Sequence, residues 1–167
     1  IGHDIANLKA QRVILFVDPT IRNLESYKTI MESIDQHCNP CKGGLKGGVY
    51  VDVYDEICVE PTNVSFQHAI NYMTNKQNEE GAPYDAVIAL GGGSTIDTAK
   101  AANLYSCYPP KDFYDYVNPP LGKGIPVPGP LIPFIAVPTT AGTGSETTVS
   151  FYELKPTYIV CSPFVSI

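Results

Sequence analysis

Short apolar runs alternate with longer amphipathic segments along this chain. Four runs, at residues 12–17, 49–54, 85–90 and 131–138, are rich in Val, Ile and Leu or Tyr and end at Asp, Gly or Pro. Runs of this length and composition are typical of strands that are buried in a parallel sheet. We therefore expect four strands, and we expect the second to continue through a turn into residues 57–59.

The segments between these runs have the spacing of helices. Residues 21–36 place apolar side chains on one side of a helix: Leu24, Tyr27, Ile30, Met31 and Ile34. Residues 63–76 carry a similar stripe, and residues 98–104 are expected to be helical after the glycine turn that follows the third strand. A tyrosine-rich stretch at 112–117 is expected to pack as a short helix.

This order of elements predicts the fold class. Strands alternating with helices are typical of an α/β domain with a Rossmann-like, doubly wound, mostly parallel sheet and right-handed crossovers. The length of 167 residues suits one such domain. Ligands of these sheets lie beyond the carboxyl ends of the strands. Asp18, Glu60 and residues 91–93 all follow strand ends, so we expect them to meet at one edge.

The turn after the third strand reads Gly-Gly-Gly-Ser at 91–94. Glycines let a ligand approach the backbone, and the N–H groups of the following helix can bind a phosphate. Ser94 or Thr95 is expected to cap that helix, with Asp97 in its first turn. The alternative is a tight turn between strand and helix that binds nothing.

A second loop follows the fourth strand. Residues 139–148 hold five threonines, one serine and two glycines, whose hydroxyl and N–H groups can bind phosphate, ribose or carboxamide. An ordinary turn with a helix cap before Glu146 is the alternative. Beside the glycine turn, this threonine loop is expected to form the second wall of a dinucleotide cleft. The usual fingerprint is absent, because Gly-x-Gly-x-x-Gly does not occur and the first-strand carboxylate, Asp18, precedes the glycines.

Composition narrows the classes of partner. The net charge of −6 argues against nucleic acid, and no apolar run is long enough to span a bilayer. Five cysteines without framework spacing suit a reducing compartment. Cys38 and Cys41 form a CxxC in a Gly/Lys-rich loop, for which a flexible insertion is favoured over a metal or redox role.

Two motifs resemble the iron-containing (group III) alcohol dehydrogenases. They are the Gly-Gly-Gly-Ser turn with Asp97 and Lys100, and Pro-Thr-Thr-Ala-Gly-Thr-Gly-Ser-Glu at 138–146, and they occur in the family's order. The stretches at 59–62, 101–104 and 115–117 are similar to one branch, the mitochondrial hydroxyacid-oxoacid transhydrogenases. The resemblance covers about residues 12–148.

The resemblance implies that this part of the chain binds NAD. Asp18 would accept hydrogen bonds from the adenosine ribose and disfavour a 2′-phosphate, and residues 92–94 would hold the pyrophosphate. Asp97 would lie near the nicotinamide, and the threonine loop would line the other wall. The expected cofactor-binding residues are Asp18, Gly92, Gly93, Ser94, Thr95, Asp97, Thr139, Thr140, Thr143 and Thr148.

The resemblance also implies a reaction. The branch oxidises 4-hydroxybutyrate to succinate semialdehyde and passes the hydride, through bound NAD, to 2-oxoglutarate, giving 2-hydroxyglutarate. A divalent metal, iron or zinc, acts as Lewis acid on ligands in a helical C-terminal domain. The implied partners are small hydroxyacids and oxoacids, with a homo-oligomer left open, in the mitochondrion. No leader is visible in this chain, and no catalytic residue or metal ligand is assigned to it.

The family pattern is lost near the end of the chain. No Asp-x-x-x-His helix for the metal occurs, and residues 149–167 diverge from the family. We therefore expect a dinucleotide-binding domain at 1–148 and a divergent tail at 149–167, from a fragment, a splice product or a faulty gene model that is inactive alone. The alternatives are an NAD-dependent metal alcohol dehydrogenase, a glycerol dehydrogenase or dehydroquinate synthase relative, and a non-catalytic dinucleotide-binding module.

Overall fold

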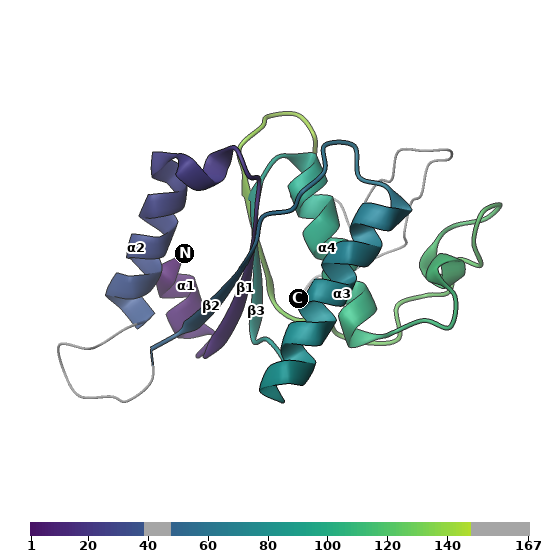
Figure 1. Cartoon of the computed structure of the whole chain (residues 1–167), viewed down its shortest axis with the longest axis horizontal. Coiled ribbons are helices and arrows are strands. Elements are labelled where there is room, and N and C mark those ends of the chain that lie inside the picture. Colours follow the sequence, from purple (N-terminus) through teal and green to yellow (C-terminus); the bar gives the residue numbers. More distant parts are fainter. Residues whose placement is uncertain (39–47, 148–167) are drawn as a thin grey trace.

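A four-stranded parallel sheet with helices on both faces forms the molecule (Figure 1). This computed structural model describes residues 1–38 and 48–147. The strands are β1 (Arg12–Val17), β2 (Tyr50–Tyr54), β3 (Ala86–Gly91) and β4 (Phe134–Pro138), in the order β2-β1-β3-β4. The predicted α/β class with a doubly wound parallel sheet is confirmed.

The two central strands are apolar on both sides because helices cover both faces. Val13, Leu15 and Val17 of β1 pack on one face, and Ile14 and Phe16 pack on the other. All five side chains are fully buried. Burying a side chain of this size stabilises the fold by roughly 1.5–3 kcal/mol, so β1 is a main source of stability.

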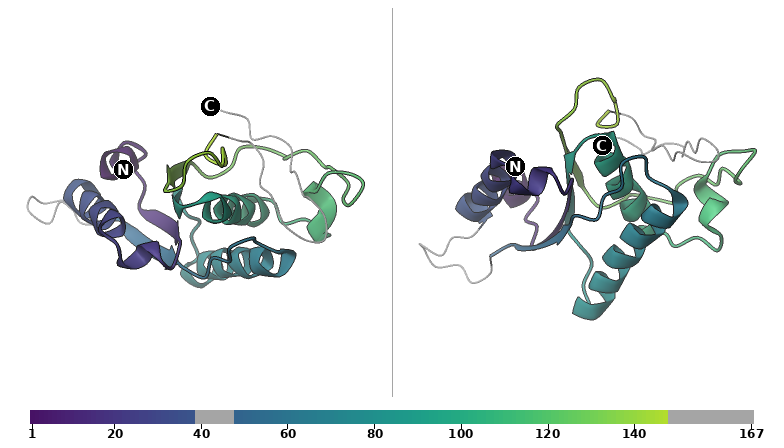
Figure 2. Two further views of the ribbon diagram at one scale, coloured as in Figure 1. Left: turned by 90° about the horizontal axis from the view of Figure 1, so that it is seen from above. Right: turned by 45° about the horizontal axis from the view of Figure 1, so that its top comes forward.

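The helices separate into two layers. Helices α1 (Gly2–Asn7) and α2 (Glu25–Cys38) cover one face, and α3 (Asn63–Glu80) and α4 (Gly93–Cys107) cover the other (Figures 1 and 2). Two short 3₁₀ helices, η1 (Ile21–Asn23) and η2 (Phe113–Tyr116), complete the elements of the described residues. The tyrosine-rich stretch at 112–117 thus contains the expected short helix.

Some element boundaries differ from the sequence prediction. Residues 21–36 divide into η1 and α2, because Leu24 has an extended backbone (φ −91°, ψ 164°). Residues 57–59 do not continue β2 as a strand. Helix α3 runs beyond the predicted end and stops at Gly81, whose positive φ of 67° suits glycine and closes the helix.

Helix α4 lies deepest in the molecule. Every residue from Thr95 to Tyr105 is buried, including several polar ones. Asn103 shows how this polarity is used: its amide donates to Ile132 O at 2.8 Å and accepts from Ile132 N at 3.2 Å. This pair of bonds holds the backbone just before β4, so α4 helps to position the fourth strand and the loop that follows.

Among the described helices, none combines the length and apolar character that crossing a bilayer requires. Cys38 is buried, and its thiol donates to Gly2 O at 3.2 Å. Cys41 and the rest of the Gly/Lys-rich loop lie outside the described residues, so the interpretation of the CxxC pair stays a prediction.

Candidate functional site

The candidate site lies where the direction of sheet growth reverses. From β1 the chain moves to β2 on one side and then to β3 on the other, so the loops after β1 and β3 diverge at their carboxyl ends. Such a switch point opens a crevice that binds ligands in doubly wound sheets. Asp18 N donates to Leu90 O at 3.2 Å, and Thr139 N donates to Gly91 O at 3.0 Å. These bonds place the three loops side by side, at the top of Figure 1.

The glycine turn leads directly into α4. The helix begins at Gly93, and Gly92 is its N-cap without a side-chain hydrogen bond. The expected caps, Ser94 and Thr95, are therefore wrong: both lie inside the first turn. Asp97 is not in that turn. The first helical hydrogen bonds come from Thr95 N and Ile96 N to Gly92 O, so the N–H groups of Gly93 and Ser94 precede them.

The three glycines let neighbouring side chains approach. A Cβ at Gly91 would lie 2.3 Å from Thr95 Oγ1, which no real Cβ could tolerate. A Cβ at Gly92 would lie 3.0 Å from Thr140 Oγ1, and one at Gly93 would lie 3.1 Å from Ser145 Oγ. The space above residues 92 and 93 is thus limited by the threonine loop, which is seated on the turn.

Thr95 contributes a buried hydroxyl at the base of the turn. Its side chain is 1% exposed, and Oγ1 has no hydrogen-bond partner within the described part of the chain. A buried hydroxyl without a partner costs about 1–3 kcal/mol. Together with the helix N-terminus, this polar atom fits a site that receives an anionic or hydroxylated group.

The threonine loop leaves most of its hydroxyl side chains outside. Thr139, Thr140 and Thr143 are exposed, whereas Ser145 is 4% exposed. Gly142 and Gly144 have positive φ angles of 88° and 70°, so the loop turns sharply on both sides of Thr143. Within residues 139–147 the backbone forms bends and turns and no helix. Thr148 lies outside the described residues.

Asp18 combines a structural contact with partial exposure. Its Oδ1 accepts hydrogen bonds from Thr20 N at 2.8 Å and from Thr20 Oγ1 at 2.6 Å, which starts η1. The side chain is half-buried, beside the carboxyl end of β3. A second predicted carboxylate, Glu60, follows β2, which β1 separates from β3. Glu60 is exposed and has a positive φ of 57°. Its expected meeting with the glycine turn stays a prediction.

A buried pair of charges lies below the two loops. Asp97 and Lys100 are each 5% exposed, and Lys100 Nζ donates to Ser145 O at 2.5 Å. Burial lowers the pKa of Lys100 from its ordinary value, while the carboxylates of Asp97 and Glu146 act in the opposite direction. In the sequence, Lys100 stands out only as part of a motif. Its contact with a loop 45 residues later is visible only in the structure.

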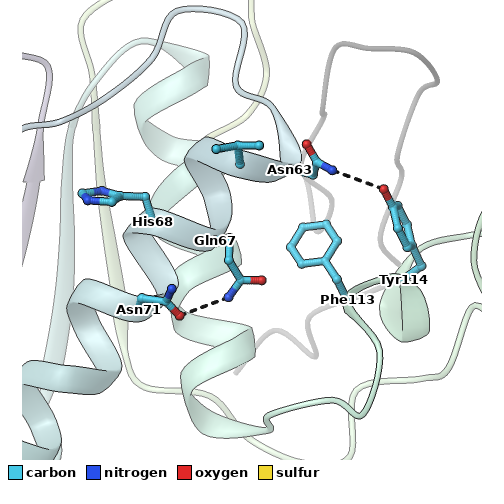
Figure 3. A pocket seen from close by; sticks show the side chains of 7 residues that line it. Asn63, Gln67, His68, Asn71, Phe113 and Tyr114 are labelled. Carbon is cyan, nitrogen blue, oxygen red and sulfur yellow. Dashed lines mark hydrogen bonds between the residues drawn. The ribbon is translucent and has the colours of Figure 1, made fainter.

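A hollow between α3 and residues 113–114 is a separate feature. It has a volume of about 440 Å³ and is lined by Asn63, Val64, Gln67, His68, Asn71, Phe113 and Tyr114 (Figure 3). None of the predicted cofactor-binding residues lines it. Hydrogen bonds join Asn63 to Tyr114 and Gln67 to Asn71, so its polar side chains already have partners. This hollow does not coincide with the switch-point site.

The described side chains do not gather into a metal site. Within residues 1–38 and 48–147, no group of three or more His, Cys, Asp or Glu side chains is placed to hold a metal ion. The described residues therefore do not provide a ligand set for the metal that the resemblance implies.

Most of the chain matches a known protein family. Residues 1–154 match the model of the family described as iron-containing alcohol dehydrogenase. Among curated proteins, the chain is 49% identical over 148 residues to the mitochondrial hydroxyacid-oxoacid transhydrogenase of Bos taurus, covering 89% of this chain and 28% of that protein. It is 46% identical over 159 residues to the Xenopus laevis protein of that name, covering 93% and 31%. The chain thus spans less than a third of the length of these relatives.

Solved structures share the fold. The chain superposes on a 1,3-propanediol oxidoreductase with a TM-score of 0.73 and 21% identity, covering 96% of this chain and 37% of that one. For NADH-dependent butanol dehydrogenase A of Thermotoga maritima, the TM-score is 0.75 at 21% identity, with 97% and 36% covered. For sulfoacetaldehyde reductase of Bifidobacterium kashiwanohense in complex with NAD⁺, it is 0.72 at 22% identity, with 99% and 40% covered.

Proposed function

We propose, since this chain belongs to the iron-containing alcohol dehydrogenase family, that residues 1–148 form the NAD-binding part of a hydroxyacid-oxoacid transhydrogenase. The observation that carries the proposal is the seating of the threonine loop on the glycine turn at the switch point of the sheet. The identity of 49% to a transhydrogenase supports the choice of activity within the family. Residues 149–167 are proposed to lie outside this binding unit.

The pyrophosphate of NAD is proposed to lie over the start of α4. The N–H groups of Gly93 and Ser94 precede the first helical hydrogen bonds, so they can donate hydrogen bonds to an anion. The helix dipole also favours negative charge there. Gly92 has no side chain in this position, and the buried hydroxyl of Thr95 supplies a further polar atom beneath the turn. A net charge of −6 does not prevent this, because backbone groups provide the attraction.

The adenosine ribose is proposed to lie against Asp18. A carboxylate accepts hydrogen bonds from both ribose hydroxyls and repels a 2′-phosphate, which favours NAD over NADP. The half-buried side chain at the end of β1 is held by Thr20, so its direction is fixed before a ligand arrives. This fixed direction reduces the entropy lost on binding.

The threonine loop and Asp97 are proposed to complete the nicotinamide side. Thr139, Thr140 and Thr143 are exposed hydroxyl side chains on a loop that contacts the glycine turn, and Thr148 is proposed to join them. Hydroxyl groups suit this wall because they donate and accept hydrogen bonds without adding charge. Bound NAD would accept and return a hydride between the two half-reactions.

The substrates, location and metal are also proposals. The two substrates would be 4-hydroxybutyrate and 2-oxoglutarate, and the mitochondrial names of the relatives favour that compartment. Iron or zinc would polarise the alcohol oxygen in the complete family enzyme. The described part of this chain contributes cofactor binding, and a homo-oligomer is compatible with the proposal.

Calorimetry on the 167-residue chain tests the central claim. We expect NAD to bind one site per chain, with NADP at least about tenfold weaker because of repulsion at Asp18. Absence of NAD binding, in a sample whose circular dichroism shows the α/β fold, would overturn the proposal. Equal affinity for NADP would leave the cleft in place and remove Asp18 from the ribose role.

A further inference from the structure

We propose that Lys100 is a positioning residue whose ammonium fastens the threonine loop (residues 139–147) to α4 and so sets the separation between the two walls of the cleft. This inference deepens the proposed function and rests on it where NAD is concerned. The contact between α4 and the loop can be tested without any cofactor.

The first observation is the unusual environment of the lysine. Lysine is almost never fully buried unless it is paired, because its charge loses hydration. Lys100 is 5% exposed, and its Nζ donates to the backbone carbonyl of Ser145 at 2.5 Å. The bond connects two elements that lie 45 residues apart in the chain. A buried ammonium directed at a loop carbonyl has a fixed partner, not merely a place in the core.

The second observation is that the loop is buried at Ser145. Its side chain is 4% exposed, while those of Thr139, Thr140, Thr143 and Thr147 are exposed. The missing Cβ of Gly93 lets Ser145 Oγ approach to 3.1 Å from the position that the Cβ would occupy. The loop therefore meets α4 at its beginning through Gly93 and farther along the helix through Lys100.

The third observation is the distribution of charge. Asp97 lies one turn before Lys100 on α4, and Glu146 follows Ser145 on the loop. Both carboxylates favour the charged ammonium, although burial lowers the pKa of Lys100. Negative groups from both walls thus act on one cation. Hydrogen bonds from charged donors are roughly twice as strong as neutral ones, so this contact is strong enough to hold a loop.

The glycine turn and the threonine loop therefore differ in what holds them in place. The glycine turn forms part of a strand-to-helix connection that the core itself fixes, whereas most side chains of the threonine loop are exposed. Removing the ammonium should release the loop and leave the sheet intact. If Lys100 only filled the core, its substitution would instead weaken β1 and β3 as much as the loop.

Hydrogen exchange distinguishes these outcomes in Lys100→Met and Lys100→Gln chains. We expect the amides of residues 139–147 to exchange about tenfold faster or more in Lys100→Met, because a charge-assisted bond is lost. Lys100→Gln keeps a neutral donor and should show a smaller change. Lys76→Met is the matched control, since Lys76 pairs with Glu79 on the surface of α3 and its loss should leave the loop unchanged.

Saturating NAD adds a readout that separates positioning from stability. In the unsubstituted chain, NAD should protect both residues 91–94 and residues 139–147. In Lys100→Met, protection of 91–94 should persist while that of 139–147 is lost. If NAD protects nothing in the unsubstituted chain, the proposed function fails, and the exchange rates without NAD still decide the role of Lys100.

Two results would overturn the proposal about Lys100. One is unchanged exchange of residues 139–147 in Lys100→Met. The other is a loss of protection across β1 and β3 in both variants, which would assign Lys100 to the stability of the whole fold.

Discussion

The glycines at 91–93 have two roles at the switch point. They would let a ligand approach the backbone, and their missing side chains also make room for Thr95, Thr140 and Ser145. The same positions that would approach a phosphate therefore hold the two walls together. A substitution there changes the cleft through the loop as well as through the ligand.

Gly92→Val tests this double role. The backbone of Gly92 has φ −79°, which any residue adopts, so the fold should be retained. The added methyl groups would press on Thr140 Oγ1, already 3.0 Å from a Cβ position, and occupy the space proposed for the pyrophosphate. We expect NAD affinity by calorimetry to fall about tenfold or more, with a smaller loss for Gly92→Ala. Unchanged affinity in the valine variant would contradict the assignment of the turn.

Asp18→Ser tests the ribose contact. Serine can still accept from Thr20 and start η1, so the turn should persist while the negative charge is lost. We expect NADP affinity to rise relative to NAD, by about tenfold in the ratio, as repulsion of the 2′-phosphate is removed. Asp18→Asn is the matched control, because it keeps the acceptor to Thr20 and should shift the ratio in the same direction. An unaltered ratio in both variants would exclude Asp18 from this role.

At the scale of elements, the carboxyl ends and the amino ends of the strands have different roles. The carboxyl ends carry the site, and the other end carries a network that joins β1, β2 and the start of β3. There, Asp52 accepts from Tyr84 OH at 2.6 Å and pairs with Arg12 at 3.4 Å. The Arg12 guanidinium also lies 4.8 Å from the centre of the Tyr84 ring. Charge and aromatic contacts thus fix the strand starts, far from the residues proposed to bind NAD.

Tyr84→Phe should therefore lower stability without changing NAD affinity. It leaves the buried Asp52 with one partner fewer, and we expect the free energy of unfolding to fall by about 1–2 kcal/mol at pH 7. Urea unfolding followed by circular dichroism measures this change. Tyr114→Phe, at a tyrosine 37% exposed outside the site, is the control and should change stability by less than about 0.5 kcal/mol.

The same tyrosine gives a pH dependence with a defined sign. Burial, and then the hydrogen bond to Asp52, raise the pKa of Tyr84 well above its ordinary value. Above about pH 10 the unfolded chain releases this proton and the folded chain keeps it, so stability falls as pH rises. The fall should be shallower in Tyr84→Phe, while Tyr54, whose pKa burial also raises, maintains part of it. An identical pH profile in the two chains would contradict this account.

At the scale of the molecule, helix α1 and the burial of α4 illustrate what local sequence misses. Helix α1 is six residues long with one apolar side chain in the core, Ile5, too little for a pattern to reveal. It packs tightly against α2, where Gly2 lies so close to Ser33 that a Cβ there would be 1.9 Å from Ser33 O. Helix α4 likewise buries Thr95, Asp97 and Lys100, polar residues whose depth no local pattern indicates. Both features depend on contacts between elements that are distant in the chain.

The sequence by itself determined the strand cores, the α/β class and the two loops that carry the candidate site. Apolar runs specify parallel strands because burial on both faces needs them, and glycine or hydroxyl residues after a strand mark its carboxyl end. Only the tertiary structure decided how these loops meet: that α4 starts at Gly93, that the threonine loop rests on the turn, and that Lys100 reaches Ser145. The physical reason is that such contacts depend on the packing of whole layers, which sets distances that no local pattern contains.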